Sequence, residues 1–361
     1  MKRISIIGTV GVPGNYGGFE TLAENLVNYH DEFDIDCQLT VYCSSKSFEK
    51  KIDKLKKAEL RYLNLSANGI QSIIYDGLSI FDALRRKTDV LLLLGVSGAF
   101  VLPLVRIFSS CVVVTNIDGI EWKRTKWGKL ARLFLKWSEY LAVRWSHVVV
   151  ADNFEIGVHV SEAYGRSCDI IAYGGDHALG FQATELDFDL PKNYTLGLCR
   201  IEPENNVAMI LEAFVLLPEF SLIFVGNWES SEYGRRLRSQ FQNFSNLYLV
   251  DPIYDPGKLR ALRQGAMVYV HGHSAGGTNP SLVEMMHFGI PIVSHGCSFN
   301  RHTTENKAIY FSNSDEIIDA MIELRDSDDV SIGSDMMTIA KRRYRWDVVG
   351  SEYFRLLTSS R

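Results

Sequence analysis

Residues 267–293 have the sequence MVYVHGHSAGGTNPSLVEMMHFGIPIV, in which an apolar run, a glycine-rich loop and a helical pattern follow one another. The apolar run is Met267–Val270, and the helical pattern covers Leu282–Phe288. Gly289 and Pro291 then end the helix and lead into a second apolar run. Because apolar runs without polar alternation are typical of strands buried on both faces of a parallel sheet, this order predicts a β-α-β unit.

The same alternation extends over the rest of the chain. Short apolar runs such as Ile4–Ile7 and Val90–Leu94 are separated by amphipathic stretches with helical periodicity. Such a pattern predicts an α/β fold of Rossmann-like domains. A polar and acidic stretch, Gly180–Asn193, separates two halves, so we expect domains over residues 1–185 and 186–340 that face each other across a cleft.

The composition excludes several classes of protein. The 361 residues are 46% hydrophobic and 22% charged, as in ordinary globular domains, and the net charge of −5 argues against nucleic acid as the main partner. The six cysteines form no CxxC pair, which predicts buried thiols in a reducing cytosol. The longest uncharged run, Val90–Val105, is interrupted by Gly95 and Pro103 and is too short to span a membrane. We therefore expect no transmembrane segment.

A second glycine-rich loop follows the first apolar run. The segment Gly8–Glu20 has glycines at positions 8, 11, 14, 17 and 18, a spacing that does not match the GxGxxG pattern of NAD-binding proteins. Glycines let the backbone approach a ligand, and the helix that starts near Phe19 offers its positive end. We expect this loop to face the cleft, with Gly17 and Gly18 near a bound ligand. A simple connecting loop is the alternative.

The loop and helix of the opening stretch have the features of a phosphate site. Pro280 suits the first turn of a helix, so we expect the backbone N–H groups of Ser281 and Leu282 to hold phosphate. Glu284 follows about one turn later, where its carboxylate can accept hydrogen bonds from two ribose hydroxyls.

Three stretches carry a resemblance to a known family: the first glycine loop, the segment NIDGIEWKR of residues 116–124 with Lys126 and Trp127, and GGTNPS of residues 276–281. They resemble the retaining GT-B glycosyltransferases of family 4. The more similar group is the bacterial rhamnosyltransferases of capsule and O-antigen synthesis, whose N-terminal half carries the domain of unknown function 1972. The resemblance covers essentially the whole chain. It implies two Rossmann-like domains and a C-terminal helix, residues 341–361, that returns to the first domain.

The resemblance implies a site for a nucleotide-diphosphate sugar, with two departures from the family pattern. Gly276 replaces the first of two family glutamates, and Asn205 stands near the position of a family lysine. Arg200 remains to pair with the diphosphate, and Arg301 is a weak candidate for the second charge. No carboxylate pair indicates a metal site, so we expect neither a metal nor another cofactor. The expected donor-binding residues are Gly17, Gly18, Arg200, Gly277, Thr278, Asn279, Ser281, Leu282 and Glu284.

Asp118 and Glu121 follow another apolar run and are expected at a strand end that faces the cleft. The resemblance favours acceptor binding by these carboxylates, whereas capping of the following helix is the alternative. We assign catalysis to both carboxylates and to Arg200, while His271 and His273 fit either packing or catalysis. The expected acceptor-binding residues are Tyr16, Asp118, Glu121 and Trp122.

Residues 123–145 are basic and rich in tryptophan, although the chain as a whole is acidic. Such a segment suits an anionic membrane surface, and predicts a cytoplasmic protein peripherally bound to the inner membrane. Leu130, Leu133 and Leu141 also fit an ordinary core face at helical spacing. The expected membrane contacts are Lys123, Arg124, Lys126, Trp127 and Lys129.

The function implied is transfer of L-rhamnose, with retention, from dTDP-L-rhamnose to a saccharide linked to polyprenyl diphosphate in cell-surface polysaccharide synthesis. Two alternatives remain open. One is a nucleotide-sugar epimerase of the same fold, which would need acid and base groups but no acceptor. The other is an inactive membrane-bound scaffold, which the missing family glutamate and lysine would explain.

Overall fold

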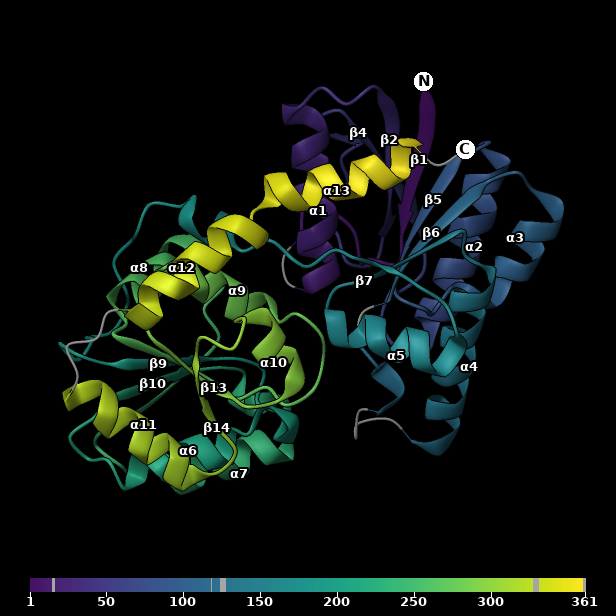
Figure 1. Cartoon of the computed structure of the whole chain (residues 1–361). Helices are drawn as coiled ribbons and strands as arrows, with labels where there is room; N and C mark the ends of the chain where they lie inside the picture. Colours follow the sequence, from purple (N-terminus) through teal and green to yellow (C-terminus); the bar gives the residue numbers. More distant parts are fainter. Residues whose placement is uncertain (15–16, 118, 124–127, 327–330, 360–361) are drawn as a thin grey trace. The chain divides into compact units, whose positions relative to one another are not determined.

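The computed structural model describes residues 1–14, 17–117, 119–123, 128–326 and 331–359. It contains two compact units, which are Met1–Tyr173 with Trp346–Arg361, and Gly174–Arg345. Each unit is a Rossmann-like α/β domain (Figure 1), as the strand pattern predicts. The division falls before the polar stretch in which the sequence places the boundary. The reason is that this region packs on the second unit: the Gly175 amide donates to Tyr344 O at 2.7 Å, and the Thr184 amide to Gly257 O at 3.2 Å.

The N-terminal unit is built on an eight-stranded sheet with the order β3-β4-β2-β1-β5-β6-β7-β8. All neighbouring strands are parallel except β3 and β4. The central strand β5 has the sequence VLLLL and is buried along its whole length. The strands are β1 (Lys2–Ile7), β2 (Cys37–Ser44), β3 (Lys54–Leu55), β4 (Ala58–Leu63), β5 (Val90–Leu94), β6 (Val112–Ile117), β7 (Val148–Ala151) and β8 (Asp169–Ile170).

The helices of this unit cover both faces of the sheet. The C-terminal helix α13 packs on α1, where the Phe354 ring stacks on Tyr29 with 5.6 Å between centroids. Asn116 Nδ2, at the end of β6, donates to Tyr353 Oη of α13 at 2.5 Å. No helix in the described part of the chain is long and apolar enough to cross a membrane. The helices are α1 (Gly18–Glu32), α2 (Gln71–Arg85), α3 (Leu102–Phe108), α4 (Lys129–Trp145), α5 (Phe154–Tyr164) and α13 (Trp346–Ser359), with the 3-10 turns η1 (Ala99–Val101) and η2 (Glu121–Lys123).

The C-terminal unit has a six-stranded parallel sheet with the order β11-β10-β9-β12-β13-β14. Phe214, Phe224, Trp228 and Phe311 are fully buried in its core. Its strands are β9 (Thr195–Leu198), β10 (Leu222–Val225), β11 (Leu247–Val250), β12 (Val268–His271), β13 (Ile292–His295) and β14 (Ile309–Phe311). Its helices are α6 (Val207–Val215), α7 (Glu232–Phe241), α8 (Pro256–Gly265), α9 (Pro280–Met286), α10 (Ser298–Thr303), α11 (Ser314–Asp326) and α12 (Ser331–Arg343), with η3 (Asp176–Leu179), η4 (Pro203–Asn205) and η5 (Trp228–Ser230).

The order of strands reverses once in each sheet, between β1 and β5 in the first and between β9 and β12 in the second. The loops that leave two such strands diverge, and ligands of open α/β sheets bind beyond the carboxyl ends of the strands at this point. The two loops richest in glycine, Gly8–Gly18 and Gly272–Asn279, both follow strands at these reversal points. The topology therefore gives each unit one natural binding edge.

Candidate functional site

In the C-terminal unit, the loops after β9 and β12 are joined by side-chain hydrogen bonds to backbone. Asn206 Nδ2 donates to Gly272 O at 2.8 Å, and Ser274 Oγ donates to Glu204 O at 2.8 Å. A Cβ atom at position 272 would lie 2.1 Å from Asn205 O, so the loops approach closely enough to require glycine there. The two loops thus form one connected surface at the reversal point.

Arg200 lies on this surface with its side chain 48% exposed, and its guanidinium is 3.7 Å from Glu202 Oε1. The side chain of Asn205 is buried, and its Nδ2 donates to Arg200 O at 2.7 Å. Asn205 therefore positions the arginine loop and does not supply a polar group to a ligand. The sequence places Asn205 near a family lysine, but contains no signal for this positioning role.

Helix α9 begins with Pro280, as the sequence predicts, and Asn279 is its N-cap residue. The Leu282 amide donates to Asn279 O at 3.1 Å, so it is already used within the first turn. This differs from the expectation that Leu282 offers a free N–H to phosphate. The Ser281 amide has no acceptor among the described residues, and it remains the one of this predicted pair that can still donate.

Glu284 is buried in α9, and both of its carboxylate oxygens have protein partners. Oε1 lies 3.2 Å from His177 Nε2 of η3, and Oε2 accepts from the Arg263 guanidinium of α8. Burial raises the pKa of Glu284, but Arg263 and His177 outweigh this effect and the net pKa is lowered. The carboxylate is therefore charged and fixed in orientation. Any ribose hydroxyl must use a remaining lone pair, so the assigned role of Glu284 stays a prediction.

His271 is buried at the end of β12, and its ring stacks on His273 with 4.4 Å between centroids. Its Nδ1 is 3.3 Å from Tyr269 Oη, while its Nε2 is buried without a hydrogen-bond partner among the described residues. Burial lowers the pKa of His271 well below its usual value, and the nearby His273 and His295 lower it further. A neutral imidazole is thus held at the end of this strand.

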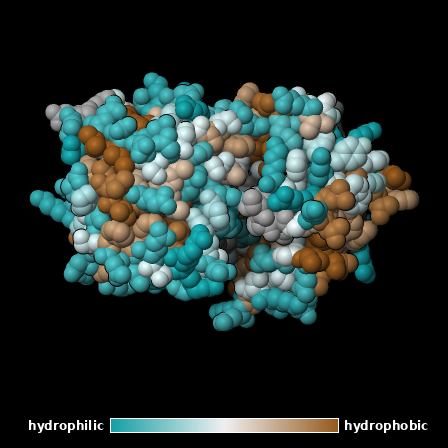
Figure 2. Space-filling view, turned by 90° about the horizontal axis from the view of Figure 1, so that it is seen from below, coloured by the Kyte–Doolittle hydropathy of each residue, from teal (hydrophilic) through white to brown (hydrophobic). Residues whose placement is uncertain are grey.

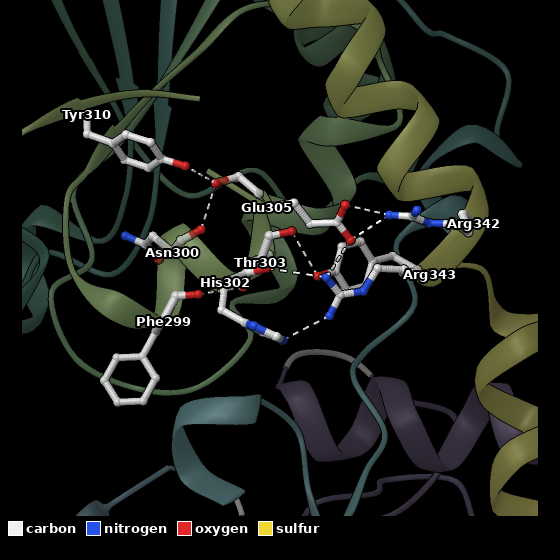
Figure 3. A network of polar contacts seen from close by, with 10 residues as sticks. Phe299, Asn300, His302, Thr303, Glu305, Tyr310, Arg342 and Arg343 are labelled. Carbon is white, nitrogen blue, oxygen red and sulfur yellow. Dashed lines mark hydrogen bonds and ion pairs between the residues drawn. The ribbon is translucent and has the colours of Figure 1, made fainter. Parts of the chain in front are cut away.

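A polar network links α10 and the turn after it to the end of α12 (Figure 3). Glu305 accepts from Arg342 at 2.5 Å and from Arg343 at 2.8 Å, and His302 Nε2 lies 3.0 Å from the same Arg343. Asn300 of α10 donates to His273 O at 2.8 Å and to His295 O at 2.9 Å. Through Asn300, α10 therefore holds the loops after β12 and β13 together.

Arg301 of α10 is exposed and lies over the ring of Tyr310, with 4.1 Å to the centroid. Its Nε donates to Gly296 O at 3.0 Å. These two contacts hold the side chain close to its own helix. Gly277 and Thr278 are buried in the loop before α9, whereas Asn279 is partly exposed.

The glycine loop of the N-terminal unit is bound to the first turns of α1. Glu20 accepts from Thr9 Oγ1 at 3.0 Å and from the Val10 amide at 2.8 Å, and Glu24 accepts from the Gly14 amide at 2.8 Å. Gly17 precedes the helix with φ of 127°, a Cβ atom at this position would lie 2.0 Å from Glu20 Oε2, and Gly18 is the first helical residue. Two of the loop amides are therefore already paired with carboxylates of the chain itself.

The predicted acceptor residues are described only in part. Tyr16 and Asp118 lie outside the described residues, and of Glu121 only the backbone, in η2, is described. Trp122 Nε1 donates to Glu139 Oε2 at 3.1 Å, and the ammonium of Lys136 lies 5.1 Å from the centre of the indole. Trp122 is thus anchored on α4.

Glu139 was not found by sequence reasoning. It is buried in α4 and also lies within hydrogen-bond distance of His159 Nε2, at 2.8 Å, and Tyr164 Oη, at 2.6 Å. Three donors around one buried carboxylate satisfy its charge and link η2, α4 and α5. The only signal in the sequence is an acidic residue on an otherwise apolar side of the helix.

Of the predicted membrane contacts, Arg124, Lys126 and Trp127 lie outside the described residues, while Lys123 and Lys129 are exposed. Leu130 is 85% exposed and Leu133 is 67% exposed, whereas Leu141 is buried. The core-face interpretation of α4 is therefore correct for Leu141 but wrong for the two leucines of its first turns.

Comparison with known proteins gives one family match for each half of the chain. Residues 181–340 match the family described as Glycosyl transferases group 1, and residues 1–176 match the Domain of unknown function DUF1972. No curated protein matches the chain.

Three solved structures illustrate the fold at low sequence identity. Sucrose-phosphate synthase from Thermosynechococcus elongatus has a TM-score of 0.81 at 12% identity, with 100% of both chains covered. A glycosyltransferase from Rickettsia africae ESF-5 has a TM-score of 0.74 at 11% identity, covering 100% of this chain and 99% of that one. A UDP-N-acetylglucosamine 2-epimerase, described as putative, from Listeria monocytogenes has a TM-score of 0.65 at 13% identity, covering 99% of this chain and 96% of that one.

The two Rossmann-like domains and these structural neighbours show the GT-B fold, and residues 181–340 match a family of glycosyl transferases. Within this class, the chain joins an N-terminal DUF1972 domain to a C-terminal group 1 glycosyl transferase domain. The match of the second domain supports glycosyl transfer from a nucleotide sugar.

Proposed function

We propose that the protein transfers L-rhamnose from dTDP-L-rhamnose, with retention, to a hydroxyl of a saccharide linked to polyprenyl diphosphate. The family of the C-terminal domain supports the reaction class. The rhamnose donor rests on the resemblance of the GGTNPS segment and the DUF1972 half to bacterial rhamnosyltransferases. The single observation that carries the donor site is the exposed Arg200 on the joined loops at the reversal point of the second sheet.

In the proposed reaction, the bond from the anomeric carbon to the diphosphate oxygen breaks and a bond to the acceptor oxygen forms on the same face. The acceptor proton passes to an oxygen of the departing diphosphate, so no separate general base is required. Arg200 and the Ser281 amide stabilise the negative charge that develops on this leaving group, and Glu284 orients the ribose. The N-terminal domain binds the acceptor through the segment that contains Asp118, Glu121 and Trp122.

A lipid-linked acceptor fits the surface of α4. Lys129 is exposed at the start of this helix, with the exposed Leu130 directly after it and the exposed Leu133 about one turn further on. Exposed apolar residues beside cations are typical of helices that lie in a membrane interface. This arrangement supports peripheral association with an anionic membrane surface on the cytoplasmic side.

An epimerase is the second candidate, because the chain shares its fold with a UDP-N-acetylglucosamine 2-epimerase and holds the neutral His271 at the reversal point. It predicts conversion of a nucleotide sugar without any acceptor. Inactive scaffolding predicts neither conversion nor donor binding.

The test is a calorimetric titration of the whole protein, without added metal, with dTDP, UDP, GDP and then dTDP-L-rhamnose. We expect specific binding of dTDP and dTDP-L-rhamnose that is weakened in Arg200→Ala and unchanged in Arg235→Ala, a matched exposed arginine of α7 in the same unit. Preference for UDP or GDP would overturn rhamnose as the donor sugar. No binding to any of them would overturn the donor site.

A further inference from the structure

Three arginines of the N-terminal unit line one open pocket of about 430 Å³ that no predicted role uses. They are Arg106 in the last turn of α3, Arg144 in the last turn of α4, and Arg166, which follows α5. His147 and Tyr164 complete the wall. The pocket lies where α4 ends and β7 begins, which is the edge of the sheet opposite to the carboxyl ends of the strands.

The charges in this pocket are not balanced by carboxylates. Among the described residues, neither Arg106, Arg144 nor Arg166 forms an ion pair. Nearby acidic groups have other partners: Asp89 pairs with Arg3 at 3.3 Å, and Asp169 with Arg355 at 3.8 Å. The pocket is thus a concentration of positive charge on a chain whose net charge is −5.

Arg166 has a structural role that the other two arginines do not share. Its guanidinium donates to Val143 O, to Ser146 O at 2.7 Å and to His147 O at 2.9 Å, and so it binds the carbonyl end of α4. Burial lowers the pKa of Arg166, and the charges of Arg106 and Arg144 lower it further. Arg106 and Arg144 are exposed in the last turns of their helices, and Arg144 lies 5.5 Å from the centre of the Trp145 ring. Because no described carboxylate pairs with either guanidinium, both can bind an anion.

His147 is a fourth polar residue that lines the pocket, and the orientation of its ring is fixed. Its Nδ1 accepts from the Val113 amide at 2.9 Å, so the neutral ring carries its proton on Nε2. Burial lowers the pKa of His147, with further lowering by Arg106 and Arg166. The pocket therefore combines guanidinium donors with a neutral N–H donor, a set that suits the oxygens of a phosphate group.

The surroundings of the pocket are apolar and exposed. Ile107 is 64% exposed and Phe108 is 80% exposed next to Arg106, and Tyr140, 48% exposed, packs on Tyr164 with 6.3 Å between ring centroids. Figure 2 shows exposed hydrophobic side chains on both halves of the molecule, and in the N-terminal unit α2, α3 and α4 carry such residues. On α4 these continue through Trp137 and Leu133 towards the start of the helix. A free phosphate ion gains nothing from exposed apolar residues around its site, whereas the acyl chains of a phospholipid can contact them.

We propose that this arginine pocket binds the phosphate headgroup of an anionic phospholipid, while Ile107, Phe108 and Tyr140 enter the membrane interface. The inference rests on the membrane association proposed above, but it needs neither donor nor acceptor. It assigns membrane contact to both ends of the 17-residue helix α4, with Lys129 at its start and the arginine pocket at its end. Such an arrangement would lay the helix along the membrane surface.

The experiment is co-sedimentation of the full-length protein with vesicles of phosphatidylcholine alone, or of equal parts phosphatidylcholine and phosphatidylglycerol. We expect wild type to bind only the second kind. Each cation near an anionic surface is worth about fivefold in binding, so Arg106→Gln/Arg144→Gln is expected to weaken binding by about 25- to 30-fold. Arg166 is left intact because it holds the end of α4.

The matched control is Arg235→Gln/Arg236→Gln, which removes two exposed arginines from α7 of the other unit. Equal weakening in both double variants would show a mere dependence on net charge and would overturn the pocket. Unchanged binding in the Arg106/Arg144 double variant would overturn it too. Phe108→Ser is expected to weaken vesicle binding without changing the thermal midpoint, because this ring is exposed.

Two further arms separate the sources of failure. Stabilisation by inorganic phosphate that is lost in the Arg106/Arg144 double variant, together with unchanged vesicle binding, would replace the phospholipid by free phosphate and overturn the proposal. Titration with dTDP is run on every variant. Loss of vesicle binding with normal dTDP binding supports the pocket independently of the donor site, whereas absence of both in wild type would contradict the membrane association and the proposed function together.

Discussion

The two binding edges of the molecule have the same topology and opposite chemistry. At the reversal point of the C-terminal sheet, the loops are joined through Asn206 and Ser274, and Arg200 remains exposed. At the reversal point of the N-terminal sheet, the loop amides of Val10 and Gly14 are paired with Glu20 and Glu24. The first edge has an exposed cation and the second has carboxylates, so equivalent positions in two Rossmann-like domains differ in charge through a few loop residues.

The largest effect is expected at the buried ion pair between Arg263 and Glu284, which fixes α9 at the C-terminal edge. Arg263→Met removes the main partner of the buried Glu284 and leaves its carboxylate with His177 alone. Loss of one partner of a buried ion pair costs about 3–5 kcal/mol, so we expect a decrease of this size in the free energy of unfolding, measured by urea denaturation. A decrease below about 1 kcal/mol would show that the pair does not hold α9.

The same carboxylate predicts a pH dependence. Its pKa is lower in the folded protein than in the unfolded chain, so its stabilising contribution is present above the ordinary value of 4.5 and is lost as the pH falls through the lowered pKa. Glu284→Gln is expected to flatten the unfolding free energy over this acidic range. Identical pH profiles for wild type and Glu284→Gln would contradict the assignment.

The next effect tests the anion-binding edge directly. Arg200→Ala removes a charge-assisted hydrogen bond to the diphosphate, worth about 1.5–3 kcal/mol, or roughly 10- to 150-fold in Kd for the nucleotide. Because the side chain is half exposed, the thermal midpoint is expected to stay unchanged. Arg235→Ala serves as control. If Arg200→Ala and Arg235→Ala bind the nucleotide equally well, Arg200 does not contribute to anion binding and the contrast between the two edges is wrong.

A smaller effect is expected at the N-terminal edge. Glu20→Gln weakens the hydrogen bonds from Thr9 and Val10, at a cost of about 1–2 kcal/mol in the free energy of unfolding. Nucleotide affinity is expected to stay constant, since the Val10 and Gly14 amides of this loop already donate to carboxylates of α1. A fall in dTDP affinity equal to that of Arg200→Ala would show that the glycine loop also serves the diphosphate, and the two edges would no longer differ.

The smallest effect concerns His271. Its pKa is lowered in the folded protein, so the unfolded chain binds protons more readily below the ordinary value of 6.5 and stability falls as the pH decreases. His271→Gln is expected to reduce this slope by up to one proton between about pH 6.5 and pH 5. An unchanged slope would mean that another histidine is responsible.

Much of the fold could be predicted from the sequence, because long apolar runs such as β5 and the glycine and proline signals around α9 depend on local patterns. The observed boundary after Tyr173 lies before the expected one because Gly175 packs closely on Val283 of α9, a contact between residues far apart in the chain. Local composition around Gly180–Asn193 contains no trace of that packing.

The sequence names candidate residues for the site but not the contacts that these residues make. Pro280 is recognisable from its place before a helical pattern, and Arg200 from the resemblance to the family. The partners of Glu284 come from α8 and η3, which only the tertiary fold brings together. The same holds for Glu139 beneath Trp122 and for the arginine pocket, whose residues come from three separate segments. Patterns along one helix also could not distinguish the exposed Leu130 from the buried Leu141.

The most direct test of the central claim is release of nucleoside diphosphate from dTDP-L-rhamnose by the whole protein, measured with and without a polyprenyl-diphosphate-linked saccharide. The account predicts release that depends on this acceptor, is reduced in Arg200→Ala, and yields a product that retains the anomeric configuration of the donor. Conversion of a nucleotide sugar without acceptor, or a product with inverted configuration, would contradict it.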